Sequence, residues 1–400
     1  MEESDRVTRG RRAEELARTA ADWLSANVWS TADDPTLYHG LAGSILALRE
    51  ANDHFGDNSY SSDIDRGAEV LASAVDTCDD CSLYVGLAGL AFTLRALHRD
   101  DAADRALAIV RDRFDGTRWN GMFELLMGNA GIALGALHAG DVGLAVSALE
   151  PYLSCADPTA HGVNWAVRPS PPRSHHMAHG TLGIAYALAE VGRSAGRIDM
   201  IDLAILGAND VASRNDLGPD DFLVPHSDPP HRPDIIERYS FGWCNGPAGD
   251  AQVFRLLEVV TGERKWAALG DRCWHTIVDS GLPERRRPGF WDNNGRCCGT
   301  AGVLALACDR IVERDDDFRF ADVLVDDLVN RATVDETGAR WSNVEFRSDP
   351  SSLVPVTGWA MGNAGIVREL LRYARLCEGR APRYAIRWPD HPIALAANKS

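Results

Sequence analysis

Apolar residues along the chain recur with a helical period, and two kinds of helix alternate. In one kind, as at 44–48, 90–94 and 303–307, Ala and Leu make the segment apolar nearly all round. Such a helix is expected to be buried on several sides. In the other kind, apolar residues recur at spacings of three and four opposite a charged face, which predicts amphipathic outer helices. The clearest examples of this second kind are 12–28, 65–75, 102–114, 265–280 and 320–331.

A glycine pair with the spacing Gly-x-x-Gly precedes each all-apolar segment, and this unit occurs seven times. Glycine lets two backbones approach closely, so each unit is expected to mark the start of an inner helix. Seven units in alternation with amphipathic segments predict an all-α fold, an α/α toroid (barrel) of seven outer and seven inner helices. We expect one such domain over residues 1–400, with every inner N-terminus on the same face. The first glycines of the units are Gly40, Gly86, Gly128, Gly180, Gly246, Gly299 and Gly362.

Four connections are long and rich in Pro, Gly and Asp, and they lead into the fourth to seventh glycine units. Long connections inside a compact domain usually carry function, and we expect these to cover a site on the glycine face. Before the units at Gly40 and Gly86 we find no reactive residue, and we interpret these two units as plain helix packing. The long connections span 155–178, 215–241, 283–296 and 335–357.

Composition narrows the classes of function. The chain carries 41 Lys and Arg against 58 Asp and Glu, a formal net charge of −17, which argues against nucleic acid as a partner. No apolar stretch approaches the ~20 residues that span a bilayer, and 1–12 lacks a secretory signal, so we predict a cytoplasmic protein. Nine cysteines, an odd count, argue for reduced thiols over a disulfide framework. The pair Cys78 and Cys81 has no second CxxC partner and is interpreted as incidental.

Three cysteines lie directly before two neighbouring glycine units. Cys244 stands two residues before Gly246. Cys297 and Cys298 stand two and one residues before Gly299. Three thiols at adjacent helix starts can share one tetrahedral zinc ion and leave its fourth position open, as catalytic zinc sites do. For any one cysteine alone, a small buried hydrophobic residue is the better interpretation, and a vicinal disulfide would be strained.

The strings Trp243-Cys244-Asn245-Gly246 and Cys297-Cys298-Gly299, together with the seven glycine units, resemble the lanthionine synthetase C-like family. The resemblance covers essentially the whole chain. It implies an α/α barrel in which Cys244, Cys297 and Cys298 hold one zinc ion per chain. It also implies a cyclase that joins peptide cysteines to dehydroalanine or dehydrobutyrine as thioethers. The family's usual His is Cys298 here, a variant that some members share, and three thiolates add one negative charge to the site.

His179 and Glu124 are the candidate catalytic residues. His179 stands one residue before Gly180, and by resemblance it is the histidine that serves the cyclases in acid/base chemistry. Addition of a thiolate to an alkene leaves a carbanion that must take up a proton, and histidine has a fitting pKa. The alternative for His179 is a capping or core residue. Glu124 falls where the family usually has Asp, and the alternative for it is a solvated loop residue. His175 and His176 match no motif and are interpreted as loop residues.

Two departures concern the rest of the catalytic set. Ser240 and Asn245 stand where the family's cyclases usually carry an Arg and a Tyr, and Arg238 is nearby but out of register. The resemblance therefore implies a free-standing lanthipeptide cyclase that acts on a dehydrated precursor peptide, beside a separate dehydratase. Two alternatives stay open, namely addition of glutathione to dehydrated residues and a non-catalytic, zinc-containing scaffold that binds peptides. A glycosidase would need two opposed carboxylic acids, and only Glu124 precedes a glycine unit.

Overall fold

The computed structural model describes residues 3–284, 293–344, 349 and 351–392. Contacts group these residues into two compact units, and each unit is described by itself. Unit 1 contains the described residues of Met1–Leu71 and Gly281–Trp388. Unit 2 contains those of Ala72–Ser280 and Pro389–Ile393. The single domain over 1–400 stays a prediction.

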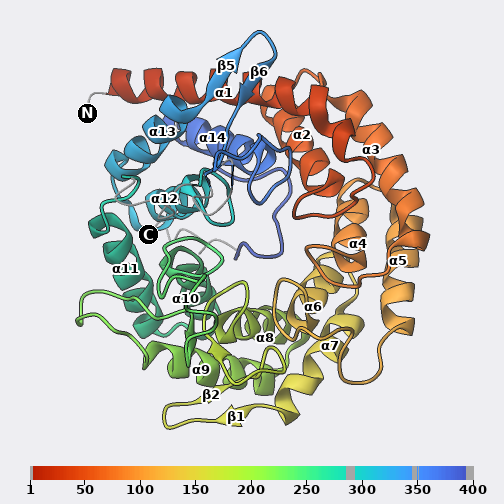
Figure 1. Ribbon diagram of the computed structural model, residues 1–400, viewed down its shortest axis with the longest axis vertical. Coiled ribbons are helices and arrows are strands. Elements are labelled where there is room, and N and C mark those ends of the chain that lie inside the picture. The colour runs from red at the N-terminus through yellow and green to blue at the C-terminus, as the bar shows by residue number, and fades with distance from the viewer. Residues whose placement is uncertain (1–2, 285–292, 345–348, 350, 393–400) are drawn as a thin grey trace. The chain divides into compact units, whose positions relative to one another are not determined.

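Unit 2 consists of helical hairpins. In each hairpin a buried helix that begins at a glycine unit packs against the amphipathic helix that follows it, as Figure 1 shows for α8 with α9. The buried helices also pack against one another in chain order. The four hairpins are α4 (Leu87–Ala96) with α5 (Asp100–Asp112), α6 (Asn129–His138) with α7 (Val142–Ser154), α8 (Thr181–Ala195) with α9 (Ile198–Ala212), and α10 (Pro247–Thr261) with α11 (Arg264–Asp279).

Unit 1 combines both ends of the chain. The first helix packs along the last one, and this last helix also contacts the two other inner helices of the unit. The inner helices are α2 (Leu41–Phe55), α12 (Thr300–Arg314) and α14 (Asn363–Cys377). The outer helices are α1 (Glu3–Asn27), α3 (Ser61–Ala74, which ends in unit 2) and α13 (Arg319–Arg331). Two short 3-10 turns, η1 (Val28–Thr31) and η2 (Val75–Thr77), follow α1 and α3.

The described residues thus contain seven inner and seven outer helices in alternation, as the glycine units predict. Each inner helix has the first glycine of its unit as N-cap residue. The first amphipathic helix begins at Glu3, nine residues before the predicted start at 12. None of the described helices combines the length and the apolar character that a membrane span requires.

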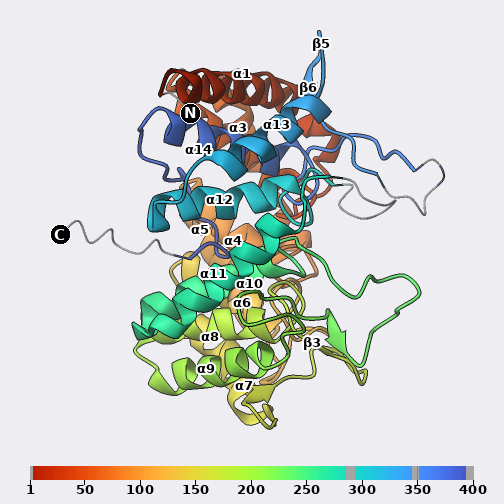
Figure 2. The ribbon, with the colours of Figure 1, turned by 90° about the vertical axis from the view of Figure 1, so that its left-hand side faces the viewer.

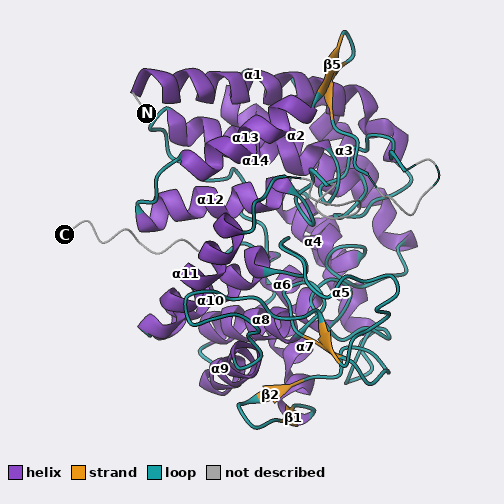
Figure 3. Cartoon of the chain, turned by 60° about the vertical axis from the view of Figure 1, so that its left-hand side comes forward, coloured by secondary structure: helices purple, strands orange, loops and turns teal. Residues whose placement is uncertain are grey.

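Among the described residues, three short antiparallel pairs of strands lie in or next to the long connections, and Figure 3 shows how little strand this part of the chain contains. Within unit 2, the pairing of β3 with β4 ties the connection before α8 to the connection before α10. Figure 2 shows β3 and the long connection into α10 at the same end of α8 and α10. Residues 285–292, 345–348 and 350 of the two later connections lie outside the described part. The strands are β1 (Asp157–Pro158) with β2 (Val163–Asn164), β3 (Arg173–Ser174) with β4 (Ser227–Asp228), and β5 (Thr333–Asp335) with β6 (Gly338–Arg340).

The start of α10 explains why a glycine unit is needed there. The chain before this helix folds back so tightly that a Cβ at Gly249 would lie 1.8 Å from the backbone oxygen of Trp243. A Cβ at Gly246 would lie 2.3 Å from the backbone oxygen of Ser240. Only glycine leaves room for these backbone contacts. The same contacts hold the segment that carries Cys244, which directly follows Trp243 in the sequence.

Candidate metal site and catalytic residues

Backbone hydrogen bonds connect the residues that stand two positions before the glycine units of unit 2. The N–H of Tyr84 donates to the oxygen of Leu126 at 3.4 Å, and that of Leu126 donates to Ala178 at 3.2 Å. The N–H of Ala178 in turn donates to the oxygen of Cys244 at 2.9 Å. Because the bonds follow one register, the segments that enter neighbouring inner helices lie side by side. Cys244 is therefore held next to the segment that carries His179.

The same register continues inside unit 1. The N–H of Cys297 donates to the oxygen of Ala360 at 2.9 Å, and the N–H of Ala360 donates to Tyr38 at 3.0 Å. Cys297 and Tyr38 both stand two positions before a glycine unit, as Cys244 does in unit 2. Cysteine or tyrosine thus occupies equivalent positions before four of the seven inner helices, namely Tyr38, Tyr84, Cys244 and Cys297.

The sulfur atoms of Cys297 and Cys298 are 3.4 Å apart, and no disulfide joins the two cysteines. The hydroxyl of Tyr38 donates a hydrogen bond to Sγ of Cys297 at 3.0 Å. Cys297 is buried, whereas Cys298 is half-buried. The interpretation of the unit at Gly40 as plain helix packing missed Tyr38. Its position two residues before the glycine, the one that Cys244 and Cys297 occupy, was the available signal.

Cys244 is only 6% exposed, and the indole of the preceding Trp243 is fully buried against the ring of Tyr84, with ring centroids 5.8 Å apart. The cysteine therefore projects from a segment that is fixed on both sides, by Trp243 and by the helix start at Gly246. The side chains at this position have little freedom to rearrange. Such a rigid support is what a metal ligand requires.

The other six cysteines do not directly precede a glycine unit. Burial is the largest influence on each of them, and it raises the pKa of the thiol above its ordinary value. A raised pKa keeps a cysteine protonated, and the protonated thiol is a poor metal ligand and a poor nucleophile. The pair Cys78 and Cys81 belongs to this group, in agreement with its interpretation as incidental. The other four are Cys155, Cys273, Cys308 and Cys377.

His179 and Glu124 lie together, both in unit 2. Nδ1 of His179 is 3.3 Å from Oε2 of Glu124. This separation is within the range of an ion pair, but Nδ1 has no hydrogen-bond partner in the described structure. The side chain of His179 is 32% exposed, while that of Glu124 is fully buried. The imidazole therefore turns one nitrogen towards the buried carboxylate and keeps an accessible edge.

The carboxylate of Glu124 is fixed by its own loop. Oε2 accepts the backbone N–H of Leu126 at 2.7 Å, and Oε1 accepts that of Met127 at 2.8 Å. These two hydrogen bonds hold the carboxylate in one orientation. The solvated loop residue considered as an alternative for Glu124 does not fit this buried position.

A second histidine, interpreted from the sequence as a loop residue, is part of a buried pair. Nδ1 of His176 lies 2.9 Å from Oδ2 of Asp250 in the first turn of α10. Both side chains are buried, and burial raises the pKa of Asp250 although His176 acts in the opposite direction. The ring of His226 is edge-on to His176, with centroids 5.6 Å apart. No family motif marks these residues, and only the charge of Asp250 inside an apolar helix could have pointed to them.

The position of the family's Arg holds no cation. The side chain of Ser240 stays in its own turn, where its Oγ accepts the N–H of Gly242 at 3.5 Å. The guanidinium of Arg238 is engaged elsewhere, since it donates to Asp216 at 2.9 Å. Arg238 therefore forms an ion pair within the connection between α9 and α10.

The chain matches the model of a known protein family. The family model described as "Lanthionine synthetase C-like protein" matches residues 31–211 and 232–325, which is more than half of the chain. No curated protein sequence matches.

Solved structures of low sequence identity share the fold. The structure of nisin cyclase is similar with a TM-score of 0.62 and 19% identity, over 90% of this chain and 93% of that chain. An α-1,6-mannanase from Salegentibacter sp. HEL1_6 is similar with a TM-score of 0.50 and 11% identity, over 91% and 99%. An unsaturated glucuronyl hydrolase specific for heparin also reaches 0.50, with 10% identity, over 92% and 98%. These likenesses concern the fold, and they confirm the all-α toroid predicted from the glycine units.

Proposed function

Since the chain belongs to the lanthionine synthetase C-like family, we propose that it is a zinc-dependent lanthipeptide cyclase. The reaction would add the thiol of a peptide cysteine to dehydroalanine or dehydrobutyrine in the same peptide. The sulfur atom bonds to Cβ, the thiol proton leaves, and Cα takes up one proton, so that a thioether ring forms with no net change in protons. The substrate would be a precursor peptide already dehydrated by a separate enzyme.

We assign the metal to Cys244, Cys297 and Cys298. These are the three ligands that the family resemblance implies, and each stands one or two residues before the first glycine of an inner-helix unit. Two sulfur ligands at about 2.3 Å from a tetrahedral zinc ion lie about 3.8 Å apart, and the 3.4 Å between Cys297 and Cys298 is close to that value. With three cysteine ligands, the fourth position of the ion is open to a substrate thiol, whose pKa zinc would lower.

We assign the proton transfer to His179. Nδ1 lies 3.3 Å from the carboxylate of Glu124, so a tautomer with its proton on Nδ1 would leave Nε2 free for the substrate. Nε2 can take the proton of the incoming thiol and later deliver one to Cα. The buried carboxylate of Glu124 stabilises the imidazolium between these two steps, in the way that an orienting acid supports a general base. The closeness of His179 and Glu124, each just before a glycine unit, is the observation that best supports this assignment.

The metal assignment is tested by zinc analysis of protein purified under reducing conditions. We expect about one zinc per chain in the wild type, as one tetrahedral site requires, and its loss in Cys244→Ala. Cys155→Ala removes an exposed thiol of the same unit and should keep the ion. A folded wild type without zinc would contradict the proposal and favour a binding scaffold.

The reaction is tested with a peptide that contains one cysteine and one dehydroalanine. Cyclisation leaves the mass unchanged but removes the thiol, so alkylation followed by mass spectrometry counts the rings. His179→Asn should lower the rate about 10²- to 10⁴-fold, the range of a lost acid/base group, without loss of zinc. With glutathione present, a product that gains the mass of glutathione would support the glutathione alternative instead.

A further inference from the structure

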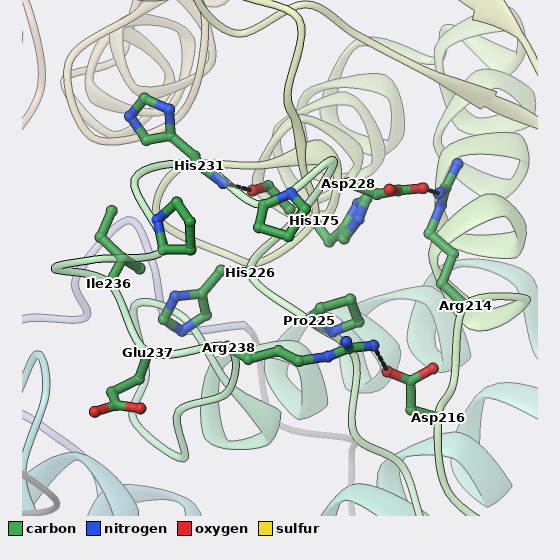
Figure 4. Close-up of a pocket in the computed structure, with 13 residues that line it drawn as sticks. His175, Arg214, Asp216, Pro225, His226, Asp228, His231, Ile236, Glu237 and Arg238 are labelled. Atoms are coloured by element: carbon green, nitrogen blue, oxygen red, sulfur yellow. Dashed lines mark hydrogen bonds and ion pairs between the residues drawn. The ribbon is translucent and has the colours of Figure 1, made fainter.

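Unit 2 contains a cavity of about 630 Å³ between β3, β4 and the connection that leads into α10. Figure 4 shows thirteen lining residues, which include His175, His226 and His231. A volume of this size falls in the range of cavities that hold small molecules or several side chains. The mechanism proposed above uses none of the residues that line it.

The inner wall of the cavity carries a histidine without a partner. His175 is fully buried, and neither of its ring nitrogens makes a hydrogen bond in the described structure. Nε2 of the neighbouring His226 is also buried and makes no hydrogen bond in the described structure. Buried polar atoms normally have a partner, because an unsatisfied donor or acceptor destabilises the fold. These unsatisfied nitrogens therefore lie in the wall of the cavity, just below its surface.

Both histidines are neutral at physiological pH. Burial is the main reason that the pKa of His175 is lowered to about 3, and His176, Arg214 and His226 add to the shift. Burial likewise lowers the pKa of His226 to about 3, against a hydrogen bond with the backbone of Asn245. A neutral imidazole offers one donor and one acceptor. The two rings therefore favour a ligand that both accepts and donates hydrogen bonds.

The charged residues of the cavity do not favour an acidic ligand. Arg238 is paired with Asp216 at 2.9 Å, and Arg214 is paired with Asp210 at 3.0 Å. Figure 4 marks the pairs of Arg238 with Asp216 and of Arg214 with Asp228. Since each arginine already has a carboxylate partner, a carboxylate or phosphate would find no uncompensated cation here. Proline rings and Ile236 supply the apolar part of the lining.

The cavity adjoins the candidate catalytic residue. His175 and His179 belong to one tight segment before α8, in which a Cβ at Gly180 would lie 2.4 Å from the backbone of His175. The ring of His226 packs edge-on against that of His176, which belongs to the same segment. A peptide that reacts at His179 can therefore place a nearby residue in the cavity, because an extended chain advances about 3.3 Å per residue.

We propose that this cavity binds an uncharged side chain with a hydroxyl or carboxamide group, presented by the peptide substrate a few residues from the reacting dehydroalanine. The proposal rests on the proposed cyclase function. A rotation of their rings towards the cavity would let His175 and His226 supply the hydrogen bonds. Ile236 and the prolines would contact the aliphatic part of the side chain. The cavity would thus select which ring of a precursor peptide is closed.

The test compares synthetic peptides that share one cysteine and one dehydroalanine. Asn, Thr, Ala or Asp is placed in turn at each of the four positions on either side of the dehydroalanine. At one position, the Asn or Thr peptide should have a kcat/KM about 5-fold above that of the Ala peptide, the value of one or two net hydrogen bonds. The Asp peptide should show no such gain. Fluorescence anisotropy of the same labelled peptides measures binding apart from the reaction.

A matched pair of variants assigns the preference to the cavity. His175→Leu should abolish the ratio between the Asn and Ala peptides, whereas His161→Leu, at an exposed histidine of unit 2, should keep it. If His175→Leu does not fold, His226→Leu and the wild-type peptide series decide. Cyclisation of all peptides at equal rates would overturn the cavity proposal and leave the cyclase intact. If no peptide cyclises, the proposed function fails, and equal binding of all peptides would then overturn the cavity proposal as well.

Discussion

The imidazole of His176 and the carboxylate of Asp250 form a buried pair, with Nδ1 at 2.9 Å from Oδ2 and 3.1 Å from Oδ1. The pair joins the segment that carries His179 to the first turn of the helix that follows Cys244. Burial raises the pKa of Asp250, so the charged carboxylate is costly in this place, and His176 offsets part of the cost. The pair acts on the candidate site by positioning it, since neither residue belongs to the proposed reaction.

The first prediction concerns the coupling between these two residues. Asp250→Ala alone should lower the free energy of unfolding by about 3 kcal/mol, because it leaves a buried imidazole without its partner. The double variant with His176→Ala should lose less than the sum of the two single losses, with a coupling of about 1–3 kcal/mol. Urea unfolding monitored by circular dichroism measures all four proteins. The exposed pair of Arg197 and Asp199 serves as control and should show a much smaller coupling. Additive losses would show that the contact between His176 and Asp250 stabilises nothing.

The second prediction is a loss of stability in acid caused by the buried histidines. An unfolded histidine binds a proton below about pH 6.5, but His175 and His226 in the folded protein stay neutral down to about pH 3. The unfolded state therefore binds more protons over this range. The free energy of unfolding should fall by about 1.4 kcal/mol per pH unit for each such histidine as the pH drops from 6 to 4.

Unfolding curves of His175→Gln measure this contribution, because glutamine does not titrate. Its stability should fall less steeply than that of the wild type between pH 6 and 4, by the amount of one histidine. His161→Gln, at an exposed position, should keep the wild-type slope. Parallel profiles for the wild type and His175→Gln would mean that His175 is protonated in the folded protein.

The sequence predicts the helices well because their starts are encoded locally. Each glycine unit stands where a backbone contact excludes a side chain, as at Gly249, and the apolar run after it defines the inner helix. The pairing of His179 with Glu124 also agrees with the sequence, since both residues precede glycine units. By contrast, Tyr38 could be found only by comparing the register of the units, and no local pattern marks the partner of His176. The cavity depends on how the connection 215–241 folds against β3, which helical periodicity does not encode.

The third prediction concerns the hydroxyl of Tyr38, which donates to Sγ of Cys297 at 3.0 Å. A hydrogen bond to a ligand sulfur stabilises its thiolate form, and loss of such an outer contact typically weakens metal binding. Tyr38→Phe should therefore lower zinc affinity about 10-fold, measured by competition with a chelator. In the cobalt-substituted protein, the charge-transfer absorption band from thiolate sulfur to the metal should shift as well.

Tyr60→Phe is the control for this variant, since it removes a tyrosine hydroxyl that donates to Asp22 at 2.7 Å, with no cysteine as partner. It should leave both the zinc affinity and the cobalt spectrum unchanged. Equal behaviour of Tyr38→Phe and Tyr60→Phe would show that Cys297 is not a metal ligand or that the hydroxyl does not act on it.

The fourth prediction tests why the glycine unit before α10 is needed. A methyl group at Gly249 would lie 1.8 Å from the backbone oxygen of Trp243, and a carbonyl in a fixed turn cannot move aside cheaply. Gly249→Ala should therefore lower the free energy of unfolding by about 3 kcal/mol and also weaken zinc binding, because Trp243 precedes Cys244. Gly270 in α11 has open space around the same methyl group, so Gly270→Ala should instead stabilise the protein by about 0.5–1 kcal/mol. Thermal and urea unfolding compare the two variants. A Gly249→Ala protein as stable as the wild type would mean that this glycine is not required for the close contact that fixes Cys244.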